Sequence, residues 1–283
     1  MLKVIRKKSD LKEAVGSFKQ KGKTIGLVPT MGALHSGHLS LVELSHSQYD
    51  VTVVSIFVNP TQFNNKEDLD KYPRSEESDI NLLSKTSCDL VFIPSADEMY
   101  ASTPLIKLDF GYLENIMEGK FRPGHFNGVG LVVAKLLGLT EPNGAFFGQK
   151  DIQQFRVISA LVKDLDIPVK LHMAPIVREM SGLAMSSRNE RLNDEQKSTA
   201  SNLFKSLQIA AKLITSGNSL EKAKKEAFEF LGQLKNIELE YFEIVDFETL
   251  QNIPSVNKGE QLVLCLAAHI GGIRLIDNIV IEL

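Results

Sequence analysis

The segment Pro29-Thr-Met-Gly-Ala-Leu-His35-Ser-Gly-His38 is the stretch of sequence that decides the fold. The apolar run from Thr24 to Pro29 predicts a strand, and the pattern from about Gly37 to Ser47 predicts a helix. Glycine allows the chain to turn tightly between the two. We expect free backbone N–H groups and a helix dipole at this turn, and both favour a bound phosphate.

The turn carries two histidines, His35 and His38, three residues apart. Residues at this spacing share one side of a helical turn. Imidazoles can donate hydrogen bonds to phosphate oxygens without adding a permanent full charge. A loop with two surface histidines is the alternative, but the coincidence of two glycines, two histidines and a passage from strand to helix favours the phosphate site.

The alternation of apolar runs and amphipathic segments continues through the first two-thirds of the chain. The run from Val51 to Val58 is apolar at nearly every position, which suits a parallel strand covered on both faces. Strands that alternate with helices predict an α/β fold with a Rossmann-like, doubly wound parallel sheet, whose ligands bind at the carboxyl ends of the strands. Further strands are predicted at 89–94, 144–147 and 169–175, and helices at 75–86, 129–139 and 153–165.

From about Arg178 the alternation of strands and helices gives way to two polar-faced helices followed by three strands. The change predicts two domains: a Rossmann-like domain at residues 1–177 and a smaller α+β domain at residues 178–283. The strands of the second domain end in a pair joined by Ile270-Gly-Gly. Its helices are predicted at 194–216 and 219–235, and its strands at 239–245, 261–268 and 273–281.

The composition is that of an ordinary globular protein. Of the 283 residues, 43% are hydrophobic and 24% are charged, and a formal net charge of −3 offers no basic footprint for nucleic acid. The N-terminus lacks the apolar core of a signal peptide, and no stretch approaches the ~18 apolar residues of a membrane span. We therefore expect a soluble, cytoplasmic protein that binds neither nucleic acid nor membrane.

The cysteines and histidines give no sign of a metal site. Cys88 and Cys265 lie within apolar runs, and neither has a partner at metal-ligand or redox spacing. There is no HExxH motif and no Gly-x-Ser-x-Gly elbow. We predict no protein-bound metal, so an anionic ligand must be met by hydrogen-bond donors and a few placed cations.

Polar side chains follow the predicted strand at 51–58. Asn59 and Gln62 are neutral hydrogen-bonding groups, which suit a substrate that carries hydroxyl or carboxylate groups. A proline-anchored turn that caps the next segment is an equal alternative. Arg122 and His125 lie in a glycine-rich loop that precedes a helix and could supply cationic contacts.

Two further segments could hold phosphates. Lys150, at the end of a predicted strand, could neutralise a phosphate, and Asp151 could cap the helix on which Gln154 follows one turn later. The alternative is a solvated Lys–Asp pair. The segment Met185-Ser-Ser-Arg188 offers two hydroxyls and a guanidinium fork, although a polar domain linker is slightly favoured when that segment is taken alone.

Taken together, five segments resemble signatures of the pantothenate synthetase (pantoate–β-alanine ligase) family, in order and over essentially the whole length. They lie at 31–38, 57–63, 122–129, 148–151 and 185–188. The first belongs to the wider HxGH nucleotidyltransferase superfamily, whereas the set of five is specific. The resemblance implies that pantoate attacks the α-phosphorus of MgATP and that β-alanine then displaces AMP from the pantoyl adenylate.

The resemblance also implies roles for individual residues. His38 is the proton donor of the family, acting with His35, Lys150 and Arg188. Gln62 and Gln154 match the glutamines that bind pantoate, and Asn59 and Arg122 are additional substrate contacts. The ATP site comprises Met31, Gly32, Ala33, Leu34, His35, Ser36, Gly37, His38, Gly148, Gln149, Lys150, Asp151, Val177, Met185, Ser186, Ser187 and Arg188.

Some expectations stay open on the sequence alone. The family resemblance implies a homodimer, and we expect the second domain to act as a lid over the adenylate. Gln149 stands where an acidic residue is common in the family, which we expect to tune affinity. Two rivals are a nucleotidyltransferase that moves AMP or CMP onto a phosphate ester and a non-catalytic nucleotide sensor. A tRNA synthetase is disfavoured because neither an anticodon-binding domain nor a basic surface is present.

Overall fold

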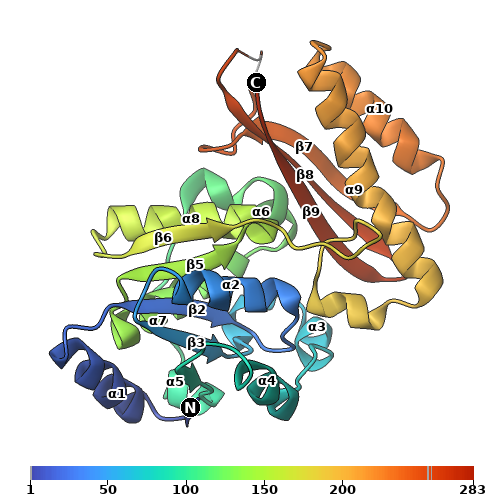
Figure 1. Ribbon diagram of the computed structural model, residues 1–283. Helices are drawn as coiled ribbons and strands as arrows, with labels where there is room; N and C mark the ends of the chain where they lie inside the picture. The colour runs from blue at the N-terminus through green and yellow to red at the C-terminus, as the bar shows by residue number, and fades with distance from the viewer. Residues whose placement is uncertain (1, 254, 256) are drawn as a thin grey trace. The chain divides into compact units, whose positions relative to one another are not determined.

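The computed structural model describes residues 2–253, 255 and 257–283, and the chain forms two compact units (Figure 1). The first unit comprises the chain up to Gly148 together with Val157–Pro175. The second comprises Gln149–Arg156 and Ile176–Leu283. Met1, with which the predicted first domain begins, lies outside the described residues. The predicted domain boundary after residue 177 stays a prediction.

The first unit is built on a six-stranded parallel sheet, which confirms the predicted doubly wound fold. From β2 (Ile25–Thr30) the chain adds β3 (Val51–Ile56) and β4 (Leu90–Phe92) on one side and then returns to add β5 (Gly144–Gly148) and β6 (Lys170–Ala174) on the other side. The direction of winding therefore reverses between β2 and β5, where ligands bind in such sheets. The strands in spatial order are β1 (Lys3–Ile5), β4 (Leu90–Phe92), β3 (Val51–Ile56), β2 (Ile25–Thr30), β5 (Gly144–Gly148) and β6 (Lys170–Ala174).

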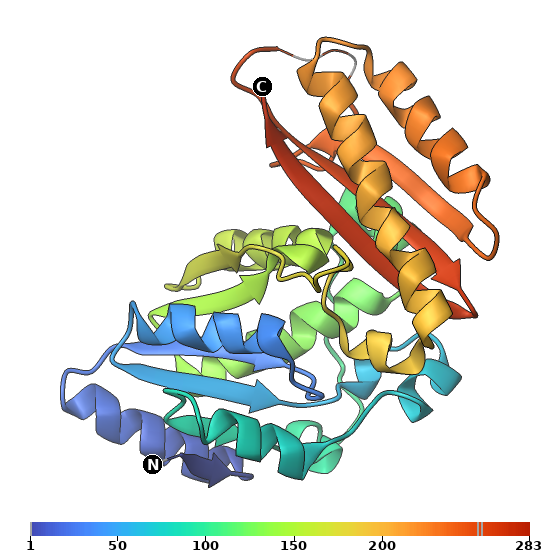
Figure 2. The same ribbon diagram turned by 45° about the vertical axis from the view of Figure 1, so that its right-hand side comes forward.

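Helices cover both faces of this sheet (Figures 1 and 2). On one face, Leu41 and Leu83 from two of the helices pack against Val28 and Val54 of the central strands. The helices are α1 (Lys8–Gln20), α2 (Ser36–His46), α3 (Lys66–Asp70), α4 (Glu76–Leu83), α5 (Ala96–Met99), α6 (Met117–Phe121), α7 (His125–Thr140) and α8 (Ile152–Asp164), with 3-10 turns η1 (Pro60–Gln62) and η2 (Gly111–Glu114). The first turn of α8 belongs to the second unit.

The second unit contains a three-stranded antiparallel sheet and two helices, as predicted. Alternate residues of the central strand, such as Leu262, Leu264 and Leu266, lie in one core cluster with the buried residues of the helices. The elements are η3 (Gln149–Asp151), η4 (Ser187–Arg191), α9 (Asp194–Thr215), α10 (Leu220–Gly232), β7 (Glu238–Asp246), β8 (Gln261–Ile270) and β9 (Ile273–Glu282).

Some elements differ from those expected. Helix α7 begins at His125 and not at Val129, because Gly124 adopts a left-handed conformation (φ 78°) that ends the preceding turn and starts the helix. Strand β1 and helix α1 were not predicted from the sequence. Among the described residues, no helix combines the length and apolarity that crossing a membrane would require.

Candidate functional site

The predicted histidine turn lies directly after β2, at the point where the winding of the sheet reverses. Gly32 and Ala33 adopt left-handed conformations, with φ of 84° and 49°. Two N–H groups of the turn point at one buried carboxylate, that of Asp79 on α4: Ala33 N donates to Oδ2 at 2.9 Å and Leu34 N to Oδ1 at 2.8 Å. A Cβ at Gly32 would lie 3.1 Å from Asp79 Oδ2, so glycine allows the close approach.

The two histidines cap helix α2 reciprocally. Nδ1 of His35 accepts a hydrogen bond from Gly37 N at 3.2 Å, and Nδ1 of His38 accepts one from His35 N at 3.3 Å. The rings lie side by side, with centroids 4.1 Å apart. A neutral imidazole carries one proton, so in both residues the cap places that proton on Nε2. Sequence spacing predicted that the rings share one side of the turn, and the structure adds their tautomers.

The expectation of free N–H groups in this turn is wrong for most of its residues. Ala33 and Leu34 donate to Asp79, while His35 and Gly37 donate to the histidine rings. The sequence showed that a helix start supplies donors, but it did not show which acceptors of the chain itself occupy them. A phosphate placed at this turn would therefore meet the Nε2 side of the imidazoles and not these N–H groups.

Replacing Asp79 with asparagine is expected to destabilise the turn. An asparagine offers one acceptor oxygen, so one of the two buried N–H groups would face an NH₂ group and lose its partner. We expect the free energy of unfolding to fall by ~1–3 kcal/mol, measured by urea denaturation. Amide hydrogen exchange at Ala33 and Leu34 should rise. Glu77→Gln, an exposed neighbour on α4, is the control; equal stability of the two variants would contradict the role of Asp79.

Asn59 and Gln62 form a buried cluster around η1. The Asn59 amide donates to Gln62 Oε1 and to the Gly128 carbonyl of α7, each at 3.1 Å. Its Oδ1 accepts from the Tyr100 hydroxyl at 2.9 Å and also from Thr61. Asn59 thus fixes the orientation of the Gln62 amide, whose Nε2 lies 3.1 Å from Met31 Sδ. A direct contact between Asn59 and substrate stays a prediction.

Arg122 and His125 hold the backbone of η1 at Gln62. Arg122 Nη1 lies 3.1 Å from His125 Nε2, and since a guanidinium only donates, Nε2 is the acceptor. The proton of His125 is therefore on Nδ1, which donates to the Gln62 carbonyl at 2.8 Å. Glu118 Oε2 lies 3.6 Å from Arg122 Nη1. The structure thus brings the predicted residues Arg122 and Gln62 together through a buried histidine.

Gly128 allows α7 to approach η1 closely. A Cβ at this position would lie 2.3 Å from the Thr61 carbonyl oxygen, so Gly128→Ala must displace the backbone that carries Gln62. We expect a loss of ~1–3 kcal/mol in the free energy of unfolding, typical of overpacking. Gly138→Ala in the same helix is a matched control, because a Cβ there would meet nothing within 4 Å. This control should gain ~0.5–1 kcal/mol, and a similar gain for Gly128→Ala would contradict the close approach.

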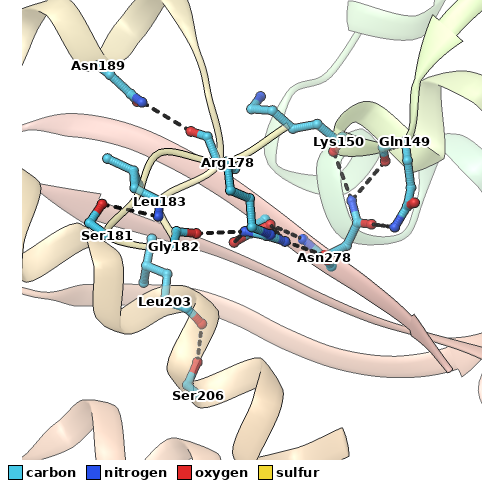
Figure 3. Close-up of polar contacts among 12 residues, drawn as sticks. Gln149, Lys150, Arg178, Ser181, Gly182, Leu183, Asn189, Leu203, Ser206 and Asn278 are labelled. Atoms are coloured by element: carbon cyan, nitrogen blue, oxygen red, sulfur yellow. Dashed lines mark hydrogen bonds and ion pairs between the residues drawn. The ribbon is translucent and has the colours of Figure 1, made fainter. Parts of the chain in front are cut away.

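Apart from Gly148 at the end of β5, the remaining predicted residues lie in the second unit. Figure 3 shows two of them, Gln149 and Lys150, beside Asn278 of β9. Lys150 follows β5 in the turn η3, and its side chain is 18% exposed with Nζ 3.8 Å from Asp151 Oδ1. That distance is longer than a hydrogen bond, so the Lys–Asp pair is loose. Gln154 lies in the first turn of α8.

A small hairpin brings Val177 next to the segment 185–188. Met185 N donates to the Val177 carbonyl at 3.0 Å, Arg178 pairs with Ala184, and Gly182 (φ 91°) lies in the turn. Ser186 then caps η4 by accepting from Arg188 N at 3.3 Å. The hairpin thus places the predicted site residues Val177 and Met185 side by side although the sequence separates them.

Sequence reasoning missed residues that contact these segments directly but lie outside them in the sequence. Asp79, Glu118 and Asn278 are each buried and polar, and each holds a predicted segment. The only local signal was a charged or amide residue inside an apolar or amphipathic run. Within residues 2–253, 255 and 257–283, no three His, Cys, Asp or Glu side chains are grouped as a metal ion would require.

Comparison with known proteins extends over both units. A family model described as pantoate-beta-alanine ligase matches residues 3–280. The pantothenate synthetase of Cytophaga hutchinsonii is 48% identical over 266 residues, 94% of each chain, and that of Christiangramia forsetii is 48% identical over 286 residues, 99% of this chain and 100% of the relative.

Two solved structures have the same fold over nearly the whole chain. The pantothenate synthetase of Thermus thermophilus matches with a TM-score of 0.92 at 37% identity, covering 98% of each chain. The pantoate-beta-alanine ligase of Francisella tularensis, solved with beta-gamma ATP and beta-alanine, matches with a TM-score of 0.82 at 36% identity, covering 99% of this chain and 97% of that one.

Proposed function

This chain belongs to the pantoate–β-alanine ligase family, and we propose how its own residues carry out the reaction of that family. It is an AMP-forming ligase that condenses pantoate with β-alanine to give pantothenate at the expense of ATP. The first step is an adenylation. A pantoate carboxylate oxygen attacks the α-phosphorus of ATP, the bond from that phosphorus to the bridging oxygen breaks, and pyrophosphate leaves.

In the second step, the amine of β-alanine attacks the acyl carbon of pantoyl adenylate. A C–N bond forms, the bond from the acyl carbon to the phosphate oxygen breaks, AMP leaves and the nitrogen loses a proton. The first step is needed because a carboxylate would have to expel oxide, whereas the adenylate expels a phosphate monoester. Both steps accumulate negative charge on oxygens, so donors and cations are the groups that the protein must supply.

The observation that carries this proposal is the reciprocal cap of α2. It orients His35 and His38 and keeps the proton of each neutral ring on Nε2. His38, which matches the proton donor of the family, and His35 can then each donate a hydrogen bond from Nε2–H toward the phosphates. Lys150 and Arg188 add positive charge without requiring a metal held by protein ligands.

Gln62, Gln154, Asn59 and Arg122 are proposed to serve the substrates. Gln62 supports this assignment best, because Asn59 holds its Oε1 and leaves the direction of its amide defined. Arg122 is only 18% exposed, so its charge is poorly screened by water and can attract a carboxylate.

Four further features are proposed and rest on the family resemblance. Mg²⁺ enters bound to the phosphates of ATP, since this ion is usually held through substrate phosphates and waters. The protein is a cytoplasmic homodimer. Residues 178–283 act as a lid that keeps water from the adenylate; unchanged small-angle scattering and protease protection on adding ATP and pantoate would contradict that role.

An assay of AMP release from ATP tests the proposed function. Under multiple-turnover conditions, AMP should be released only when both pantoate and β-alanine are present. Pantoate alone should support the exchange of pyrophosphate into ATP. Release of pyrophosphate driven by a phosphate ester instead of pantoate would indicate the rival nucleotidyltransferase. AMP formation that requires neither substrate would overturn the assignment.

A further inference from the structure

Strand β9 carries a buried polar pair, Asp277 and Asn278, which are 4% and 1% exposed. Successive residues of a strand point to opposite faces of the sheet. Asp277 shares its face with Leu275 and Ile279, which belong to or pack on the apolar core, and Asn278 points away from that core. A strand that buries two adjacent polar side chains, one on each face, needs partners for both.

The Asn278 side chain is fully engaged with the turn that carries Lys150 (Figure 3). Its Nδ2 donates to the Gln149 carbonyl and to the Lys150 carbonyl, each at 2.9 Å. Its Oδ1 accepts from Gln149 Nε2 at 3.1 Å. Since carbonyl oxygens only accept, both N–H bonds of the amide are assigned and its orientation has no alternative. A single side chain therefore fixes two consecutive peptide groups of η3.

Asn278 is itself held in place by its neighbours. Its N–H lies 2.7 Å from Asp277 Oδ1, and its carbonyl accepts from Arg178 Nη2 at 3.1 Å. Arg178 binds Asp277 with both arms of its fork, at 2.7 and 2.9 Å, and lies 3.6 Å from the ring centroid of Phe204. Burial raises the pKa of Asp277 and the Arg178 hydrogen bonds oppose that rise. The position of Asn278 is thus set independently of the turn that it holds.

We propose that Asn278 is a positioning residue for Lys150, fixing the backbone from which the ammonium group reaches the phosphates of ATP. The inference rests on the proposed role of Lys150. The side chain of Lys150 has rotatable bonds of its own, but the peptide groups on both sides of its Cα are bound to Asn278 through the Gln149 and Lys150 carbonyls. A displacement of about 1 Å at a reacting group can cost about 10²-fold in rate.

The test is a double-mutant cycle between Asn278 and Lys150. Asn278→Ala is expected to lower kcat/KM for ATP in the pyrophosphate-exchange step by about 10–10²-fold, with KM for β-alanine unchanged. Added to Lys150→Ala, it should cause no further loss, because its effect is exerted through the lysine. Multiplicative losses in the double variant would overturn the inference, whereas a Lys150→Ala variant with full activity would instead contradict the proposed function.

Ile279→Ala is the matched control for a merely structural effect. It alters the next residue of β9, whose side chain packs against the apolar core on the face of the sheet opposite to Asn278. Ile279→Ala should lower the melting temperature and leave the kinetics of the folded enzyme unchanged. If Asn278→Ala does not fold, Asn278→Ser, which keeps one donor, takes its place in the cycle. The same kinetic change in Ile279→Ala as in the Asn278 variant would contradict positioning.

Discussion

Replacing His38 with alanine is expected to lower kcat about 10²–10³-fold, the usual cost of removing one donor that stabilises charge in the transition state. The side chain is proposed to present its Nε2–H to the phosphates, because its Nδ1 accepts from His35 N. Steady-state AMP release and the pyrophosphate-exchange rate measure the change. Both should fall together, since the first chemical step is affected.

Two further variants separate this chemistry from the capping of α2. His38→Glu keeps an acceptor at the third helical position, so it can restore the cap, while its carboxylate offers no hydrogen-bond donor to a phosphate. We expect its stability to match the native protein and its kcat to remain low. His46→Ala, in the last turn of the same helix and exposed, should leave both unchanged. Recovery of the rate in His38→Glu would reduce His38 to a capping residue.

Lys150→Ala is the second substitution with a large expected effect, again about 10²–10³-fold in kcat/KM for ATP. The lysine is the cation at the end of β5, 18% exposed and only loosely paired with Asp151. In the proposed mechanism, removing it leaves the charge that develops on the departing pyrophosphate without this partner. The rate of pyrophosphate exchange at subsaturating ATP reports the loss directly.

Lys150→Met distinguishes the charge from the packing of the aliphatic stem. It retains an unbranched apolar side chain of similar length, so an equal loss in the alanine and methionine variants assigns the effect to the ammonium group. Lys163→Ala, exposed in the last turn of α8, should behave as the native protein. A methionine variant with native kinetics would contradict the role of the positive charge.

The sequence predicted the strands and long helices well because their signals are local. Val51–Ile56 is a mostly apolar run in a strand that is buried along its whole length, and the run from Leu262 to Ala268 in β8 is likewise apolar and buried at every position. Strand β1 was missed because it has three residues, with Lys3 and Val4 exposed at the edge of the sheet. A strand this short has no measurable period.

The supporting residues of the candidate site could not be predicted in the same way. Asp79 accepts hydrogen bonds from the N–H groups of Leu34 and Ala33, which lie 45 and 46 residues away in the sequence. Asn278 donates to the carbonyls of Lys150 and Gln149, which lie 128 and 129 residues away. No local pattern connects positions so far apart. Which residues approach the ligand stays a prediction from the five family segments, while the tertiary fold alone decides which side chains hold those segments.

The internal bonding of the histidine turn has a consequence for the kinetics of nucleotide capture. Fixing the backbone of one residue costs about 1–2 kcal/mol in conformational entropy, and here Asp79 and the two rings have already imposed that order during folding. A nucleotide that binds at this turn, as proposed, would not have to organise it. Association should therefore be limited by diffusion and desolvation, and its rate should depend weakly on solvent additives that favour or oppose chain ordering.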